Sequence, residues 1–205
     1  MKDQLQKPKF STNLEKLSDR MNTFNLIISS HRNYEQYTER EIWFTLMMIG
    51  DANSVVMHSP IPGILLVNTK LDPYWVIRKI RMILRKEPSF FQYILRVIPI
   101  DRAIETDLDL IHQVSLQLYR TKKKLSRKWK SFAIQIKKRA TPLSRNDIIN
   151  KIVPDIPNKV DLKKPDWILH FEIIGNITGI SLMKSSDIFR ILPEQKLVLD
   201  SNSLV

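Results

Sequence analysis

Residues 159–183, KVDLKKPDWILHFEIIGNITGISLM, hold the clearest structural pattern in the chain. Two runs rich in aromatic and β-branched residues, 167–174 and 177–183, flank the dipeptide Gly175-Asn176. Because Gly and Asn tolerate the backbone angles of a tight turn and such runs favour extended structure, this arrangement predicts a β-hairpin. We expect the hairpin to form the centre of a sheet.

The composition is that of a globular protein. The chain has 205 residues, of which 43% are hydrophobic and 26% charged, so it has room for one large domain or two small ones. Cysteine is absent, which excludes thiol nucleophiles, disulfides and cysteine zinc sites, and the four histidines lack metal-binding spacing. The four glycines form no phosphate-binding loop.

No apolar run approaches the roughly 18 residues of a membrane-spanning helix. We therefore expect no membrane partner. The absence of cysteine fits a cytoplasmic protein, and the lack of metal-binding spacing and of a phosphate-binding loop leads us to expect neither a metal nor a cofactor.

The net charge of +12 is concentrated in one segment. Residues 120–164 contain 15 basic and 3 acidic residues, whereas the rest of the chain contains 18 of each. A concentrated excess of this kind is typical of a protein that binds a polyanion, most often nucleic acid. The alternative is a solvated surface without a specific partner.

The first half contains six predicted elements in the order strand, helix, strand, strand, helix, strand. They cover residues 24–29, 37–50, 54–58, 64–68, 73–88 and 91–98. Asp72 is a predicted N-cap, and Pro73 fits the first turn of the helix that follows. The water-facing side of that helix is expected to carry Arg78, Lys79, Arg81, Arg85 and Lys86.

This order predicts an α+β ferredoxin-like (βαββαβ) unit over residues 21–100, with both helices on one face of an antiparallel sheet. Residues 1–20 are predicted to be a flexible tail, and residues 191–205 a C-terminal tail.

The acidic stretch 101–109 could suggest a metal or acid-base site, since it contains Asp101, Glu105, Asp107 and Asp109. We interpret it as the start of a helix, because Thr106 can act as an N-cap and acids in a first turn complement the helix dipole. This helix is predicted to end near Tyr119.

A basic strand end followed by a helix start forms the strongest candidate site. Residues 131–138 alternate between apolar and polar side chains, which predicts a half-buried strand that ends in Lys137, Lys138 and Arg139. Ser144 is then a predicted N-cap for a helix that ends near Val153. The free N–H groups of a helix start favour an anion, and Arg145 adds further charge. A single phosphate or a nucleic-acid backbone would both fit, and the other cations nearby favour the longer polyanion.

Two further features leave alternatives open. Trp129 lies within the basic run RTKKKLSRKWK, where it could stack on an unpaired base or anchor the core. His170 and Glu172 share one face of the predicted hairpin strand, and we expect both to be solvated rather than catalytic.

The strings FAIQIKKRA, SRNDIINKI and NKVDLKKPDWILHFEIIGNITGISLM, in this order, resemble the THUMP domain, an RNA-binding module of tRNA-modifying enzymes and their partners. The resemblance covers residues 101–190, and residues 21–100 are similar to the N-terminal half of THUMP proteins. It implies an α/β THUMP domain that follows the ferredoxin-like unit and holds the 3′ CCA end and acceptor stem of tRNA.

The chain most resembles the standalone THUMP adaptor that assists an RNA cytidine acetyltransferase in forming N4-acetylcytidine in tRNA. Since about 15 residues follow Arg190, we expect no catalytic domain, no catalytic residue and no enzyme activity. The resemblance implies that the RNA-facing residues are Lys137, Lys138, Arg139, Arg145, Asn146, Lys151, Lys159 and Lys163. Asp161 and Asp166, in the VDL and PD motifs, are expected to form turn and cap hydrogen bonds.

Two alternative functions fit the same sequence. The basic segment could dock an acidic surface of a partner protein, or the chain could be the RNA-binding subunit of a different tRNA-modifying enzyme.

Overall fold

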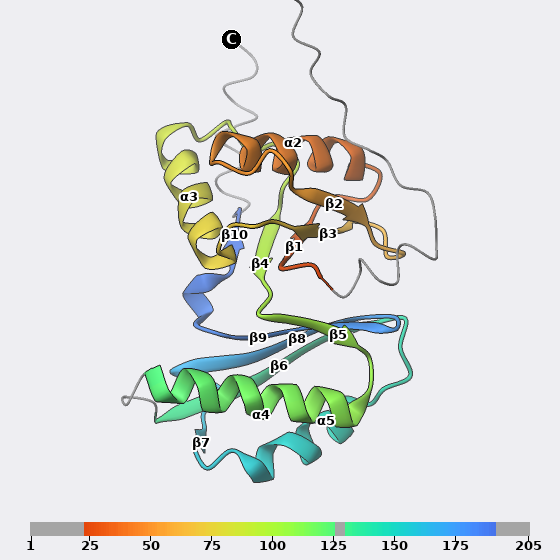
Figure 1. Cartoon of the computed structure of the whole chain (residues 1–205), viewed down its shortest axis with the longest axis vertical. Coiled ribbons are helices and arrows are strands. Elements are labelled where there is room, and N and C mark those ends of the chain that lie inside the picture. The colour runs from red at the N-terminus through yellow and green to blue at the C-terminus, as the bar shows by residue number, and fades with distance from the viewer. Residues whose placement is uncertain (1–22, 126–129, 192–205) are drawn as a thin grey trace, which may run out of the picture.

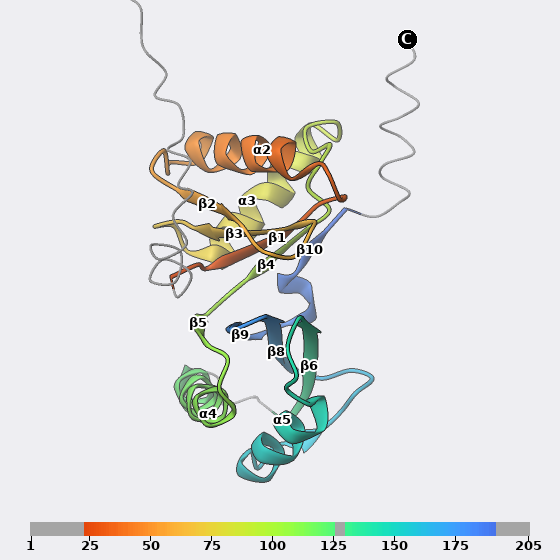
Figure 2. The ribbon, with the colours of Figure 1, turned by 90° about the vertical axis from the view of Figure 1, so that its right-hand side faces the viewer.

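The computed structural model describes residues 23–125 and 130–191. Within them, two five-stranded sheets face each other, and helices cover the outer face of each sheet (Figure 1). Figure 2 shows α2 and α3 on one side of the pair of sheets and α4 and α5 on the other. None of the helices in these residues has the length and apolar character needed to cross a lipid bilayer.

The first sheet has the strand order of a ferredoxin-like unit, as predicted. Its first four strands pair antiparallel in the order β4-β1-β3-β2, and a fifth strand, β10, pairs with β4 at the edge. The elements are β1 (Leu26–Ser29), α2 (Glu35–Met48), β2 (Val55–His58), β3 (Ile64–Asn68), α3 (Pro73–Lys86), β4 (Arg96–Pro99) and β10 (Phe189–Arg190). The Asp72 side chain caps α3 by accepting from the N–H of Trp75, which confirms the predicted helix start.

The strand predicted over residues 91–98 is wrong in its first half, because β4 begins only at Arg96. Phe91 and Ile94 are fully buried, but they belong to a loop. The Glu41 carboxylate accepts hydrogen bonds from the backbone N–H groups of residues 92–94, so these groups need no neighbouring strand. The prediction failed because the apolar residues of this segment are buried in a loop, where they give the same sequence pattern as a buried strand.

The second sheet has the order β5-β9-β8-β6-β7, and the predicted hairpin lies at its centre. Strands β8 and β9 pair antiparallel across Gly175, which has a φ of 61°, while β6 runs parallel to β8. The elements are β5 (Arg102–Glu105), α4 (Leu108–Leu125), β6 (Ser131–Arg139), α5 (Arg145–Ile152), the 3-10 turn η1 (Val153–Asp155), β7 (Lys159–Val160), β8 (Trp167–Ile174), β9 (Ile177–Met183) and the 3-10 turn η2 (Ser185–Asp187).

The acidic stretch 101–109 differs from its prediction. Four of its nine residues, Arg102–Glu105, form strand β5, which pairs with β9. The N-cap of α4 is Asp107 rather than Thr106, because the Asp107 carboxylate accepts from the N–H of Leu110 at 2.8 Å. The Thr106 hydroxyl instead contacts the hydroxyl of Thr178. Helix α4 also continues six residues beyond the predicted end at Tyr119, to Leu125.

A buried apolar cluster joins the two sheets. Side chains from the inner face of the first sheet pack against side chains at the turn of the β8–β9 hairpin and at the end of β9. The cluster includes Phe24, Ile27, Met57, Leu66, Ile98, Ile100, Ile174, Ile177 and Met183. The two units therefore share a core, in addition to the separate cores under their helices.

Polar contacts also connect the units. The Lys122 amine donates to Asp101 Oδ2 at 2.7 Å, to the Tyr74 hydroxyl and to the carbonyl of Leu182. Arg81, which was expected to face water, instead donates to the carbonyls of Ser186 and Ile188. That expectation was wrong because the turn after β9 covers this part of α3.

Candidate nucleic-acid interface

The predicted RNA-facing residues lie at opposite ends of the second sheet. Lys137, Lys138 and Arg139 are at the end of β6, close to the Gly175-Asn176 turn, and Arg145 and Asn146 begin α5 beside them. We call this the hairpin end. Lys159 and Lys163 lie where β6 and β8 begin. Since a strand rises about 3.3 Å per residue, the length of β6 separates the two groups by about 20 Å.

Two of the three basic residues at the end of β6 already have partners. The Lys138 amine donates to the carbonyl of Leu143 at 2.8 Å, and Arg139 pairs with Glu172 at 2.9 Å. Lys137 is exposed and has no ion-pair partner among the described residues. At the start of α5, Ser144 Oγ accepts from the N–H of Asn146, which confirms the predicted cap and occupies one of the N–H groups available to an anion.

Exposed carboxylates offset the positive charge of the hairpin end. The N–H of Thr106 donates to the carbonyl of Asn176, which places Glu105, Asp107 and Asp109 close to the hairpin turn. Lys151, another predicted contact, pairs with Asp109, and this hydrogen bond lowers the pKa of the Asp109 carboxyl. The hairpin end is therefore mixed in charge.

His170 and Glu172 are both buried, so the expectation that they would be solvated was wrong. Glu172 binds Arg96 of the first unit, Arg139 at 2.9 Å and His170 at 3.0 Å. Burial alone would raise the pKa of Glu172, but the hydrogen bond from His170 and the nearby guanidiniums hold it below its usual value. The first unit covers this face of the sheet, and the carboxylate is closed to substrate.

The opposite end of the second sheet is strongly cationic. Here β6 and β8 begin and β9 ends, and the contacts of Lys122 with Leu182 and the ring of Trp167 bring the last turns of α4 to the same place. We call this the basic end. Its exposed lysines are Lys123, Lys124, Lys130, Lys159, Lys163, Lys164 and Lys184.

Three carboxylates in the described loops of the basic end are hydrogen-bonded to backbone N–H groups. Asp161 accepts from the N–H groups of Lys163 and Lys164, and Asp166 accepts from those of Lys130 and Ser131. These bonds lower the pKa of both aspartates and confirm the predicted turn and cap roles. Asp187 caps Lys184 in the same way. Among the described residues, these three aspartates thus hold the loops that present the exposed lysines.

An aromatic residue lies among these lysines. The Trp167 ring has the amines of Lys122 and Lys184 at 5.8 and 5.7 Å from its centroid. Trp129, the predicted stacking residue, lies outside the described residues. Sequence reasoning missed Lys184, although the hairpin register places the residue after Met183 beside the start of β8.

Residues 105–183 match the family model of the THUMP domain, whose bounds coincide with the second sheet and its helices. Residues 105–183 correspond to a THUMP domain. The predicted resemblance is thereby confirmed at the level of the domain. No group of three or more His, Cys, Asp or Glu residues suited to a metal ion occurs in the described part of the chain.

Solved structures that contain a similar fold are longer than this chain. PH1313 from Pyrococcus horikoshii has 16% sequence identity and a TM-score of 0.57, and the alignment covers 79% of this chain and 55% of that protein. TrmN from Thermus thermophilus has 12% identity and a TM-score of 0.52, with 78% of this chain and 45% of that protein covered. Among curated proteins, no sequence matches the chain. The chain therefore spans about half of each solved protein.

Proposed function

We propose that the protein binds tRNA through its THUMP domain and has no catalytic activity of its own. The single observation that carries this proposal is the basic end, where seven exposed lysines from five segments gather on a THUMP domain. An array of cations from several segments suits a polyanion that extends over several phosphates. Trp167 adds an aromatic surface next to them.

The burial of one histidine–carboxylate pair supports a binding role for the hairpin strand rather than catalysis. His170 and Glu172 have the chemistry of an acid and a base, but both are buried, and Glu172 is bound by two arginines. The finer proposal is a cytoplasmic adaptor that presents the acceptor stem and 3′ CCA end of tRNA to an RNA cytidine acetyltransferase. It is supported by the resemblance to the standalone THUMP adaptor.

Salt dependence of tRNA binding tests the proposal. If the protein neutralises about five to seven phosphates, log affinity should fall with log salt concentration with a slope of about −4 to −6. Filter binding or fluorescence anisotropy with a purified tRNA measures this slope. A salt range of roughly 50 to 300 mM resolves a slope of this size. A slope near zero would contradict nucleic-acid binding.

Removal of the CCA end from the same tRNA tests the mode of recognition. Weaker binding of the truncated tRNA supports recognition of the 3′ end, whereas equal affinity contradicts it.

The adaptor role has a separate test, in which the purified chain is added to an RNA cytidine acetyltransferase and tRNA. Nucleoside analysis should show more N4-acetylcytidine with the chain present, and no change would contradict that role.

A further inference from the structure

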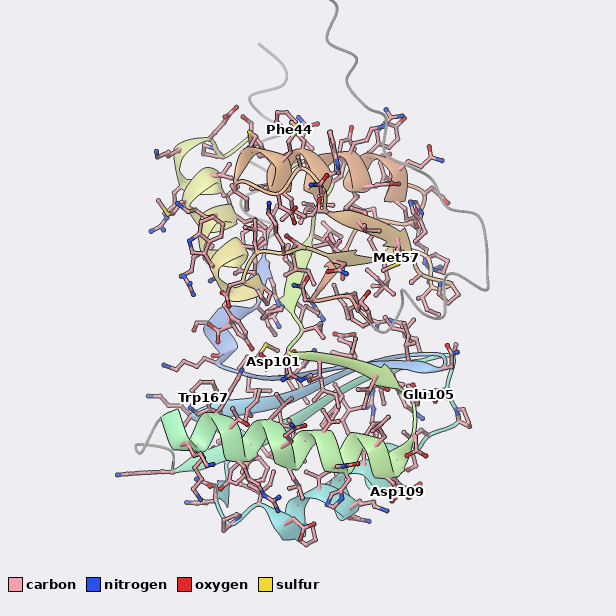
Figure 3. The ribbon with its side chains drawn as sticks, viewed as in Figure 1. Phe44, Met57, Asp101, Glu105, Asp109 and Trp167 are labelled. Atoms are coloured by element: carbon pink, nitrogen blue, oxygen red, sulfur yellow. The ribbon has the colours of Figure 1, made fainter. Side chains whose placement is uncertain are left out.

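Helix α2 has apolar side chains on its outer face as well as on its inner face. Ile42 and Leu46 are fully buried against the first sheet. On the outside, Tyr34 just before the helix, Tyr37, Phe44 and Met48 are each between 45% and 50% exposed. Figure 3 shows Phe44 on the side of α2 that points away from the sheet. A helix that is apolar on both sides is typically buried on both sides.

The second helix on the same sheet provides the contrast. The outer face of α3 exposes Arg78, Arg85 and Lys86, with one apolar residue, Met82, among them. This is the ordinary pattern of a helix whose outer face meets water. The exposed apolar stripe is therefore a property of α2 and not of this layer of the fold.

The charges around the stripe are unbalanced. All three carboxylates of α2 bind groups within the first unit: Glu35 accepts from the N–H of Gly63, Glu39 pairs with His58, and Glu41 accepts from residues 92–94. Arg32 and Arg40 are exposed, and neither forms an ion pair with a described residue. The outer face of α2 and the residues just before it thus combine apolar side chains with guanidiniums that have no ion-pair partner in the described part of the chain.

The aromatic rings at the start of the stripe are held in place by one another. The Tyr93 ring stacks on Tyr34 at 5.7 Å and on Tyr37 at 5.0 Å between centroids, with interplanar angles of 22° and 24°. Because these stacking contacts occupy ring faces, the cluster is less suited to stacking on unpaired bases than to contact through ring edges and hydroxyl groups. Tyr and Arg, together with Trp, are enriched in the energetically important centres of protein interfaces.

We propose that the outer face of α2, formed by Tyr34, Tyr37, Arg40, Phe44 and Met48, is a docking surface for a partner protein. The partner's contact surface is apolar and carries carboxylates that face Arg40 and Arg32. From residue 34 to residue 48 the stripe is about 21 Å long, which suits an amphipathic helix or a similar elongated apolar surface. This face lies at the opposite end of the molecule from α4, whose last turns belong to the basic end, so docking leaves the basic end open to RNA (Figure 1).

A photoreactive residue at position 44 tests the proposal in the cell. The full chain, with benzoylphenylalanine in place of Phe44, is expressed instead of the native protein, irradiated and examined by mass spectrometry. We expect one protein adduct whose cross-linked peptide contains apolar and acidic residues. The same residue in place of Met82 on α3 is the matched control and should give no adduct. An adduct with RNA, with a second copy or with residues 192–205, or no adduct at all, would overturn the proposal.

The charge of Arg40 supplies the second test. Arg40→Glu should reduce the yield of this adduct at least about tenfold, since a like charge replaces an attractive one in the contact. Arg40→Lys should retain it. Equal yield with Arg40→Glu would also overturn the proposal. Circular dichroism and the affinity for tRNA should be the same in all variants, so that loss of folding or of the proposed RNA binding is distinguishable from loss of docking.

Discussion

Glu172 joins the two units through a single carboxylate. One oxygen contacts Arg96 of β4 and the other contacts Arg139 of β6, while its side chain is 1% exposed. A buried carboxylate is tolerated only when cations and donors replace the water it has lost. Here those groups come from both units, so the pairing of the units and the burial of the charge depend on each other.

Replacement of this carboxylate should destabilise the protein. Glu172→Gln leaves Arg96 and Arg139 without their counter-charge, and we expect the free energy of unfolding to fall by about 3 kcal/mol. Urea denaturation followed by circular dichroism measures it. Lys137→Ala, on the same strand as Arg139 but exposed, should change stability by less than about 0.5 kcal/mol. A loss in Glu172→Gln no larger than that of Lys137→Ala would contradict the role of the network.

The same residue predicts a dependence of stability on pH. Its pKa is depressed in the folded protein, so its contribution is fully present above the ordinary value of 4.5 and is lost as the pH falls below that value, through the folded pKa. The stability difference between wild type and Glu172→Gln should therefore shrink as the pH is lowered from 7 to 3. A difference that stays constant over this range would contradict a depressed pKa.

At the scale of the element, the loop 159–164 is the part of the basic end most open to direct test. Lys159, Lys163 and Lys164 are exposed, and Asp161 fixes the loop by accepting two backbone N–H bonds. Replacement of the three lysines by alanine should reduce the salt slope of tRNA binding by about 2 to 3, at about 0.7–0.9 per phosphate. Stability should change little, because exposed charges contribute little to folding.

The hairpin end supplies the matched comparison for this loop. Lys137→Ala combined with Arg145→Ala removes two exposed cations whose surroundings contain Glu105, Asp107 and Asp109. We expect a smaller loss of slope than in the loop variant. A larger loss would assign RNA contact to the hairpin end, as the sequence pattern alone suggested.

Elements with a periodic pattern and a defined start could be predicted from the sequence. The hairpin had runs rich in aromatic and β-branched residues around Gly175-Asn176, and α3 had Asp72 and Pro73 at its start. The segment 91–95 could not, because the feature that makes it a loop is a carboxylate 50 residues earlier in the chain, Glu41. Strand β5 could not be predicted either, because the acidic residues in and around it are also typical of the first turn of a helix.

The candidate site was predictable in composition but not in arrangement. The excess of charge in residues 120–164 was visible in the sequence, whereas its division between two ends of a sheet depends on the parallel register of β6 and β8. The burial of His170 and Glu172 depends on a second sheet that covers their face. A local pattern of polar residues on a strand cannot show what lies above it.

At the scale of the whole molecule, Gly179 lies where the two units pack closely against each other. A Cβ atom there would lie 3.0 Å from Ile100 Cδ1 and 3.2 Å from the Phe24 ring. Gly179→Ala should therefore lower the free energy of unfolding by about 1 to 3 kcal/mol through overpacking. Thermal unfolding measures this loss of stability. In the double variant Gly179→Ala with Phe24→Leu, the smaller leucine side chain should recover part of the loss. Unchanged stability of the single variant would contradict close packing between the sheets.

Strand β10 has a consequence for how the chain acquires its fold. It pairs with β4, although the whole of the THUMP domain separates the two in sequence. During synthesis, the edge of β4 therefore stays unpaired until nearly ninety further residues have left the ribosome. An open strand edge is prone to pair with other chains, and contacts so distant in sequence form slowly. The first sheet of the nascent protein is therefore incomplete for a period during synthesis. Pairing of β10 with β4 covers the open edge and lowers the tendency of the chain to aggregate.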